Sequence, residues 1–388
     1  MIAAPHSHER LTEKLERLFE VRRARHDTNA PMAGMRGVAV TLVFLAHYAS
    51  QAGVNLTPGE ISSQAANVLN QIGHTGVDLF FVISGFLMYG ALVSRPQSAG
   101  AFLARRVQRI YPTFLFVLAL YIGLSILFPG AGKLPATWSA AVWHVVMNAL
   151  LLPGMIDVEP IITVAWSLSY EAFFYLAIAL FAVSYRLHTR RAPARLTMIG
   201  GLIVAGVLLT ALWFPKHVRL LMFTAGMLLF EIISAKRREG TWPLGLGAAA
   251  LVAFSIPVLS TIEGREAFGY LVLYVCFIML CLDAFSWRTL TGQVLSWAPL
   301  RWLGNMSYSY YLIHGLTLNA ALVLIRELTP VPLGDLWFWI LLPPVWLVTL
   351  VPSVALFLIV EKAYSFNFAP TGKVAATSTR ATEAEFTA

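Results

Sequence analysis

Long apolar segments alternate with short polar connections along most of the chain, and both ends are polar. A helix that spans a bilayer needs about 20 predominantly apolar residues, and ten segments have this pattern. They are 35–52, 73–93, 110–128, 164–185, 197–214, 218–235, 243–261, 268–286, 303–325 and 336–360. The sequence therefore predicts an all-α polytopic membrane protein with about ten transmembrane helices.

An eleventh apolar segment, 137–154, is short and lies between segments that contain proline. Its placement depends on charge, because cytoplasmic loops carry an excess of Lys and Arg. With ten spans and a cytoplasmic N-terminus, the inner segments hold 22 Lys and Arg and the outer loops hold 5. An eleventh span would move the basic loops 186–196 and 236–242 to the outside. We therefore predict that 137–154 is a re-entrant or interfacial helix on the outer side, and that both termini are cytoplasmic.

The polar ends divide the chain into three parts, a cytoplasmic N-terminal tail, one membrane domain and a cytoplasmic C-terminal tail. Their predicted bounds are 1–34, 35–361 and 362–388. The C-terminal tail is rich in Ala and Thr and has too few apolar residues to fold alone, so we predict that it is disordered.

The N-terminal tail contains a segment, 9–25, with apolar residues at helical spacing. Those on one face are Leu11, Leu15, Leu18 and Phe19. The pattern is typical of a short amphipathic helix that lies on a membrane surface. A solvated helix without membrane contact fits the pattern nearly as well.

Composition supports a membrane protein and argues against a soluble or nucleic-acid-binding protein. Of the 388 residues, 58% are hydrophobic and 12% are charged, whereas a soluble domain has about a quarter charged residues. Basic loops that orient helices explain the net charge of +8, so we predict no nucleic-acid partner. Cys276 and Cys281 lie in one apolar segment, which indicates packing rather than a disulfide or a metal site.

Four ionisable side chains lie within four different spans. Asp, Lys or Arg at mid-span costs about 2.5–3.5 kcal/mol, and such groups usually face an interior cavity. From the helical rise, His47 and His314 lie roughly 16 Å from the inner side. Asp78 and Glu171 lie roughly 7 and 10 Å below the outer surface. These depths are compatible with one site.

An imidazole and a carboxylate are suited to removing a proton from a hydroxyl, with the carboxylate orienting the imidazole. We therefore take His47, Asp78 and Glu171 as candidate catalytic residues. A structural role stays open for each, because a lone histidine in a membrane helix also serves as a hydrogen-bonding group between helices.

Arginines gather on the predicted cytoplasmic side. Arg105 and Arg109 are four residues apart, Arg106 lies on an adjacent stripe, and Arg36 enters the membrane at the same level. Loop orientation alone explains many such residues. Arginine without lysine, however, favours bidentate contacts with phosphate. A donor with phosphates outside the membrane and a long arm, such as acyl-coenzyme A, fits this arrangement.

Five motifs in this order resemble the acyltransferase family 3 of integral-membrane proteins, which O-acylate sugars and other hydroxyl acceptors in bacteria. They are "MRGVAVTLVFLAHY", "GVDLFFVISGFLM", "RRVQRIYP", "AWSLSYEAFFYL" and "LGNMSYSYYLIH". The resemblance covers about residues 32 to 361. "SYEAFFYL" and "ISGFLMYG" are most similar to exopolysaccharide acetyltransferases of the succinoglycan type.

The resemblance implies a ten-span fold that takes acyl-CoA, most simply acetyl-CoA, from the cytoplasm of a bacterium. It implies that His47 is the catalytic base and that Arg36 is essential, and it maps the Arg-x2-Arg pair onto Arg106 and Arg109. Many members have a second Glu after the one at Glu171, where this chain has Ala172. Because of this departure, Glu171 is the one carboxylate that this motif supplies.

The expected function is therefore transfer of an acyl group to a hydroxyl of a cell-surface polysaccharide or its lipid-linked sugar intermediate, in the bacterial inner membrane. Further candidates for lining the acceptor cavity are Trp166, Ser167, Tyr308 and His314. No metal is expected. The acyl group could pass directly from the donor to the acceptor or through a transient acyl-enzyme, and the sequence leaves both routes open. A small-molecule acceptor such as a macrolide and a proton-coupled transporter that uses the buried groups as a relay also stay open.

Overall fold

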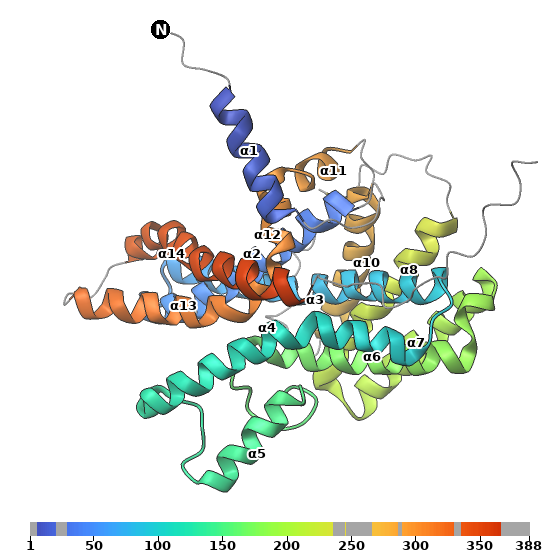
Figure 1. Ribbon diagram of the computed structural model, residues 1–388, viewed down its shortest axis with the longest axis horizontal. Helices are drawn as coiled ribbons and strands as arrows, with labels where there is room; N and C mark the ends of the chain where they lie inside the picture. The colour runs from blue at the N-terminus through green and yellow to red at the C-terminus, as the bar shows by residue number, and fades with distance from the viewer. Residues whose placement is uncertain are drawn as a thin grey trace, which may run out of the picture.

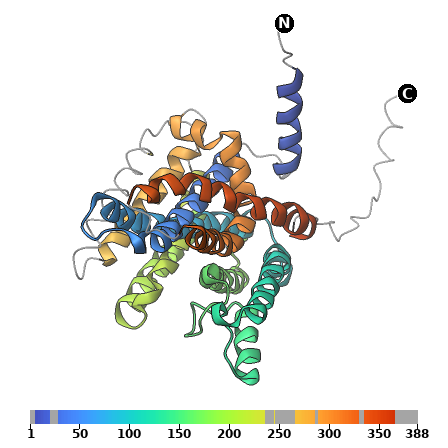
Figure 2. The ribbon, with the colours of Figure 1, turned by 90° about the vertical axis from the view of Figure 1, so that its left-hand side faces the viewer.

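The computed structural model describes residues 6–20, 29–235, 245, 266–285, 289–329 and 335–365. These residues form a bundle of α-helices (Figures 1 and 2) without a β-strand in the described ranges. The helices are α1 (His6–Phe19), α2 (Asn29–Ala52), α3 (Ile61–Ser94), α4 (Ala99–Leu127), α5 (Trp138–Ala149), α6 (Trp166–Tyr185), α7 (Ala192–Leu212), α8 (Leu221–Ala235), α10 (Glu266–Ala284), α11 (Leu290–Leu295), α12 (Ala298–Asn305), α13 (Ser307–Leu328) and α14 (Asp335–Leu356). A π-helical segment, η6 (Phe357–Ser365), continues α14.

Eight helical segments of the described part are long and apolar enough to cross a membrane. They are Ala30–Asn55, Ile61–Ser94, Ala99–Leu127, Thr163–Tyr185, Ala192–Leu212, Lys216–Ala235, Ser307–Leu328 and Asp335–Ser365. They confirm the predicted all-α polytopic membrane fold. A further apolar helix, Phe268–Ala284, is shorter, and the predicted span 243–261 lies outside the described residues apart from Gly245.

Several helices begin earlier than hydropathy predicts. The second span is predicted from residue 73, but α3 begins at Ile61. Hydropathy misses its first turns because they are polar. The first is predicted from residue 35, but α2 begins at Asn29 with Pro31 in its first turn, where the fixed φ of proline suits a helix start. The ninth is predicted as one helix from 303, but the chain breaks at Met306 between α12 and α13.

The C-terminal end also differs from its predicted bound. Helix η6 continues to Ser365, beyond the predicted start of the C-terminal tail at 362, and Lys362 within it donates to the main chain of α1. The prediction of disorder for the rest of that tail falls on residues 366–388, which lie outside the described residues.

Helix α3 is the central element of the bundle. Of its most apolar window, 72% is buried, compared with 11% for α7 at the periphery. Its close packing requires glycine, since a Cβ on Gly85 would collide with the main chain of Phe223, and one on Gly226 of α8 with the carbonyl of Val82. Small residues let membrane helices approach closely enough for their backbones to pack.

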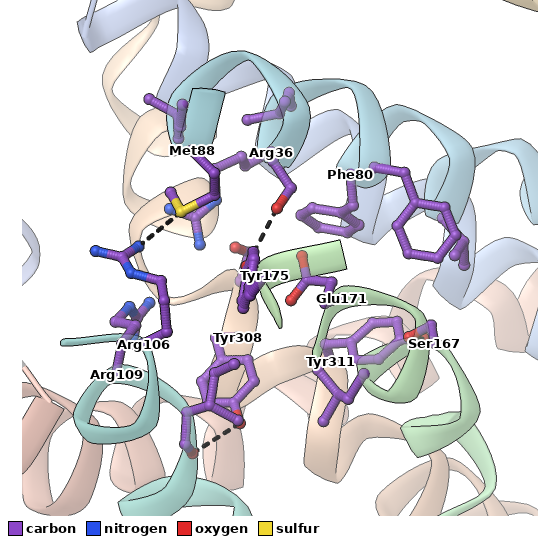
Figure 3. Close-up of a pocket in the computed structure, with 18 of the residues that line it drawn as sticks. Arg36, Phe80, Met88, Arg106, Arg109, Ser167, Glu171, Tyr175, Tyr308 and Tyr311 are labelled. Atoms are coloured by element: carbon purple, nitrogen blue, oxygen red, sulfur yellow. Dashed lines mark hydrogen bonds between the residues drawn. The ribbon is translucent and has the colours of Figure 1, made fainter. Parts of the chain in front are cut away.

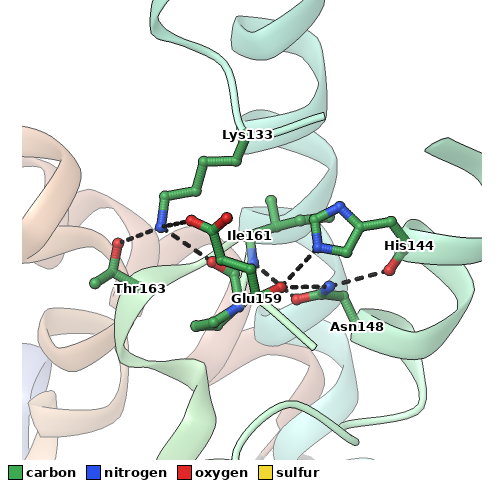
Figure 4. Close-up of polar contacts among 7 residues, drawn as sticks. Lys133, His144, Asn148, Glu159, Ile161 and Thr163 are labelled. Atoms are coloured by element: carbon green, nitrogen blue, oxygen red, sulfur yellow. Dashed lines mark hydrogen bonds and ion pairs between the residues drawn. The ribbon is translucent and has the colours of Figure 1, made fainter. Parts of the chain in front are cut away.

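The segment 137–154 forms the short helix α5, which lies apart from the bundle beside α4 (Figure 1). It has 12 residues, too few to span a bilayer. Trp138 and Trp143 are exposed on it. A polar cluster fixes the chain that follows α5 (Figure 4): Asn148 and His144 both bond the carbonyl of Glu159.

The rest of this cluster connects the same segment to the start of α6. Asn148 Oδ1 accepts the main-chain N–H of Ile161 at 2.8 Å. Lys133 Nζ donates to Pro160 O and Thr163 Oγ1, and lies 3.4 Å from a Glu159 carboxylate oxygen (Figure 4). The cluster thereby sets the position from which α6 enters the bundle.

The C-terminal end of α1 packs on the bundle instead of lying free. Phe19 stacks on Trp302 and Phe357, with ring centroids 6.0 and 6.2 Å apart. Lys362 Nζ donates to the carbonyls of Arg17 and Leu18 at 2.9 and 2.7 Å. Part of the apolar face predicted for this helix therefore contacts protein, while Leu18 stays 44% exposed. Residues 21–28 of the predicted segment lie outside the described residues.

Candidate active site

One cavity of about 450 Å³ lies between α2, α3, α4, α6, α13 and η6 (Figure 3). This volume is within the range of small-molecule sites. Residues three or four positions apart lie on the same face of a helix, and the cavity is lined by such residues. On α6 the face is Ser167, Glu171 and Tyr175, and on α13 it includes Tyr308 and Tyr311.

Three arginines line the cavity, and in Figure 3 Arg106 and Arg109 lie together at one end of it. Arg106 contacts the sulfur of Met88 with Nη1 at 3.2 Å. Arg36 enters from α2, and none of the described carboxylates lies within 4.0 Å of its guanidinium. This end of the cavity is therefore suited to an anionic ligand with several phosphate oxygens.

A buried carboxylate holds Arg109 in place. Its Nη2 lies 2.7 Å from Oε1 of Glu361, whose side chain is 0% exposed. The other oxygen of Glu361 accepts the main-chain N–H of Ser309 at 3.0 Å and also the Ser309 hydroxyl. Arg109 also lies over the ring of Tyr308 at 5.3 Å. Glu361 belongs to the π-helical η6, and π-turns are frequent at functional sites.

Glu171 lies in the middle of the cavity, next to Tyr175 (Figure 3). Its carboxylate interacts with the hydroxyls of Tyr175 and Ser84 and is within electrostatic reach of Arg36 and Arg109. The Ser84 and Tyr175 hydroxyls are themselves 3.1 Å apart. Glu171 thus serves as a counter-charge to the arginines.

The other end of the cavity is aromatic and hydroxylic, with Phe80 and Ser167 drawn there in Figure 3. Ser167 Oγ lies 2.7 Å from the Tyr311 hydroxyl, and both hydroxyls reach the carbonyl of Val164. The rings of Tyr311 and Phe80 meet edge to face at 6.1 Å. This end offers aromatic rings together with two hydroxyl groups, those of Ser167 and Tyr311.

Two histidines lie beyond this aromatic end. The rings of His47 and His314 are 5.3 Å apart, and the ring of His314 is 6.1 Å from that of Tyr311. Tyr311 therefore borders both the cavity and the histidine pair. A third imidazole, His74, meets His47 edge-on at 6.5 Å.

Asp78 does not join these histidines. Its carboxylate is buried, and Oδ2 lies 3.8 Å from Nη1 of Arg219. Arg219 also donates to the hydroxyl of Tyr270 and lies over the ring of Trp166 at 5.5 Å. Among the described residues, no carboxylate lies within 4.0 Å of the ring of His47. The expected carboxylate that orients the imidazole is therefore not found at His47 in this part of the chain.

The predicted site residues thus separate into three groups. Those that line the cavity are Arg36, Arg106, Arg109, Ser167, Glu171 and Tyr308. The histidine pair, His47 and His314, is adjacent to the cavity, while Asp78 and Trp166 surround Arg219. Arg105 is outside all three, because its guanidinium turns away to Gln97.

Four further residues of the site and its surroundings are absent from the residues predicted above: Tyr311, Tyr175, Glu361 and Arg219. Tyr308, Tyr311 and His314 recur every three residues, and Ser167, Glu171 and Tyr175 every four. These spacings were available signals for two faces of the site. Glu361 and Arg219 had no such signal, because each lies at the end of a span where an isolated charge is ordinary. Within the described residues, no group of three or more His, Cys, Asp or Glu could hold a metal ion.

Comparison with known proteins gives a consistent result. The sequence profile of the acyltransferase domain of acyltransferase family 3 matches residues 31–362. The exopolysaccharide production protein ExoZ of Rhizobium meliloti is 30% identical over 63% of this chain and 76% of its own length. Acyltransferase MdmB of Streptomyces mycarofaciens is 28% identical over 73% of this chain and 77% of its own length.

The O-acetyltransferase OatA of Staphylococcus aureus is 26% identical over 62% of this chain. The match spans 45% of the length of OatA, so more than half of that relative has no counterpart in the aligned region. No solved structure is significantly similar to the chain.

Proposed function

This chain belongs to acyltransferase family 3, whose profile it matches over residues 31–362, and from that premise we propose that it transfers an acetyl group from acetyl-CoA to a hydroxyl of a cell-surface polysaccharide or its lipid-linked precursor. The observation that carries the proposal is the juxtaposition of an arginine-lined cavity with a histidine pair, half-buried His47 and fully buried His314. The cavity is suited to the donor, and the histidines are suited to activating a hydroxyl.

Arg36, Arg106 and Arg109 would hold the phosphates of the donor. Guanidinium groups bind phosphate bidentately and keep their charge in a partly dry environment. The positive-inside pattern of the loops supports a cytoplasmic position for this end of the cavity. From there, the pantetheine arm would extend past Glu171 and Tyr175 towards Tyr311.

His47 is the base in this proposal. One of its ring nitrogens takes the proton from the acceptor hydroxyl, and the hydroxyl oxygen attacks the carbonyl carbon of the thioester. The carbon–sulfur bond breaks, and the sulfur leaves with the electron pair and receives the proton from the imidazolium. His47 lies eleven residues after Arg36 on α2, about 16 Å further along the helix axis, so phosphates and thioester would occupy the two ends of one extended donor.

The names of two relatives support the choice of acceptor. ExoZ is named for exopolysaccharide production, and OatA is named as an O-acetyltransferase. Phe80 and Tyr311 line the apolar end of the cavity, where the acyl group would lie in this proposal. The bacterial inner membrane is the proposed location, because a cytoplasmic donor and a cell-surface product require a protein that spans it.

Donor binding by the purified full-length protein in lipid nanodiscs tests this proposal. Acetyl-CoA should bind to the wild type, and Arg36→Ala and Arg109→Ala should each weaken binding by about tenfold or more, as expected for a charge-assisted contact of 1.5–3 kcal/mol. Arg105→Ala is the matched control, because it removes the same charge from α4, the helix of Arg109, at a residue that does not line the cavity. Binding that is absent in the wild type, or equally weakened by all three substitutions, would contradict the proposed donor site.

A further inference from the structure

The hydrogen bonds of His314 determine which of its ring nitrogens carries a proton. Nδ1 lies 3.0 Å from the carbonyl oxygen of Tyr310 and 2.8 Å from that of Tyr311. A carbonyl oxygen can only accept a hydrogen bond. Nδ1 therefore carries the hydrogen, and it donates to both carbonyls of the preceding helical turn.

The other nitrogen, Nε2, is then a bare acceptor in the neutral ring. His314 is 0% exposed, and Nε2 has no hydrogen-bond partner among the described residues. A buried polar atom without a partner costs about 1–3 kcal/mol, and a second proton on this nitrogen would leave a buried charge without a partner, which costs more. The site thus holds an imidazole lone pair ready to accept.

His47 is the nearby group that can donate to it. The two rings are 5.3 Å apart between centroids and inclined at 56°. Two imidazoles that share an N–H···N hydrogen bond of about 3 Å have their centroids roughly 5 Å apart. The centroid separation is therefore compatible with a hydrogen-bonded pair, although the structure does not form the bond and Nε2 of His314 is left without a partner in the described part of the chain.

The neighbouring carboxylates are engaged elsewhere. Asp78 pairs with Arg219, and Glu171 lies among the arginines of the cavity. A catalytic imidazole needs a partner on its second nitrogen, which fixes the tautomer and the orientation of the ring. Of the two imidazoles beside His47, His314 lies nearer, with ring centroids 5.3 Å apart compared with 6.5 Å for His74.

We propose that His314 is a positioning residue, whose Nε2 accepts the N–H of His47 and so leaves the other nitrogen of His47 bare and directed at the acceptor hydroxyl. This inference rests on the proposed function, because it assigns a partner to the base of that reaction. When His47 takes the proton, its N–H to His314 remains in place, so the imidazolium keeps a hydrogen-bond acceptor through the reaction.

The helices around His314 hold its ring in this orientation. The ring stacks on that of Tyr310 at 5.3 Å and 9°. The Tyr310 hydroxyl lies 2.7 Å from Thr349 Oγ1, and Thr349 donates its own hydrogen to the carbonyl of Trp346. Tyr310 must therefore be the donor in its contact with Thr349. Helix α14 thereby fixes Tyr310, and Tyr310 fixes the plane of His314.

The direct test is ¹⁵N nuclear magnetic resonance of ring-labelled histidine in the full-length protein in nanodiscs. Signals are assigned by difference with His47→Asn and His314→Gln. We expect His314 to carry its proton on Nδ1, and a scalar coupling between His314 Nε2 and the protonated nitrogen of His47. A proton on Nε2 of His314, or no coupling between the two rings, would overturn the proposal.

Turnover gives an independent readout, measured as release of CoA thiol from acetyl-CoA with water as the acceptor. His314→Leu removes the acceptor nitrogen and should lower kcat by about 10²-fold, within the range for acid–base catalysis, with KM for acetyl-CoA unchanged. His314→Gln places an amide oxygen near the position of Nε2 and should keep kcat within about tenfold of wild type. Thr317→Val, one turn further along α13 and bonded only to its own helix, is the matched control.

These outcomes separate the inference from the proposed function. If His47→Ala releases thiol as fast as wild type, the base is wrong and the proposed function fails, whatever the resonance spectra show. If His47→Ala is inactive while His314→Leu retains wild-type kcat, or if His314→Gln is as slow as His314→Leu, the positioning role alone fails. Should His314→Leu not fold, the spectra of the wild type still decide.

Discussion

At the scale of single residues, the half-buried arginines of the site are held in place by different numbers of contacts. Arg109 is held by Glu361, which in turn accepts two hydrogen bonds from Ser309. Arg106 contacts the sulfur of Met88 and the face of Phe102, and it pairs with none of the described carboxylates within 4.0 Å. The two arginines line the same cavity, yet the protein's stability should depend on them to different degrees.

We predict that Arg109→Ala destabilises the protein by several kcal/mol, because it leaves the Glu361 carboxylate buried without its counter-charge. Arg106→Ala should cost much less, because Arg106 contacts a thioether and an aromatic ring. Thermal unfolding of the purified variants measures the difference. The double variant Arg109→Leu/Glu361→Leu should recover most of the loss, and equal unfolding temperatures for Arg109→Ala and Arg106→Ala would contradict the argument.

The direction in which each side chain faces could not be predicted from the sequence. Span boundaries give the depth of a side chain in the membrane, but not its rotation about the helix axis. Asp78, Glu171 and His47 have compatible depths, yet Asp78 faces Arg219 and Glu171 faces the cavity. Similarly, Arg105 and Arg109 share a helical stripe by spacing, whereas packing of α4 on its neighbours directs Arg106 and Arg109 inward. Rotation is set by tertiary contacts that no local pattern contains.

At the scale of elements, hydropathy predicted the existence of the helices well and their ends less well. The apolar content of a window identifies the part inside the membrane, so the polar first turns of α3 and the break at Met306 were missed. Loop charges predicted that the segment 137–154 does not span the membrane. The structure has the 12-residue helix α5 there, which is too short to span, and the placement of this helix on the outer side stays a prediction.

Contact between α3 and α8 depends on two glycines, and we predict that it tolerates no added methyl group. Gly226→Ala should lower stability by about 1–3 kcal/mol, the usual cost of overpacking, since its Cβ would meet the main chain of α3. Gly201→Ala is the matched control, because a Cβ there meets open space on α7. Chemical or thermal unfolding in the same detergent compares them, and equal effects of the two substitutions would refute the packing argument.

At the scale of the whole molecule, the two described ends of the chain meet. Lys362 donates to the main chain of Arg17 and Leu18, and Phe19 stacks on Phe357. These contacts bring α1 next to η6, the helix that supplies Glu361 to the proposed donor site.

We predict from this contact that N-terminal and C-terminal reporters lie on the same side of the membrane, the cytoplasmic side. Fusions to a reporter that is fluorescent only in the cytoplasm should be bright at both ends, and fusions to a periplasmic reporter should be inactive at both ends. A reporter inserted after Lys133, in the connection between α4 and α5, should give the reverse pattern. Opposite locations for the two termini would show that the contact between α1 and η6 is not formed in the membrane.

The most direct measurement of the central claim is the rate at which purified protein consumes acetyl-CoA, compared between wild type and His47→Ala. The account predicts turnover by the wild type and a loss of about 10²-fold or more in His47→Ala, the contribution of a general base, with donor binding retained because His47 lies outside the arginine-lined cavity. Equal rates in the two proteins would contradict the assignment of the base. Absence of any turnover or binding of acetyl-CoA by the wild type would contradict the proposed donor.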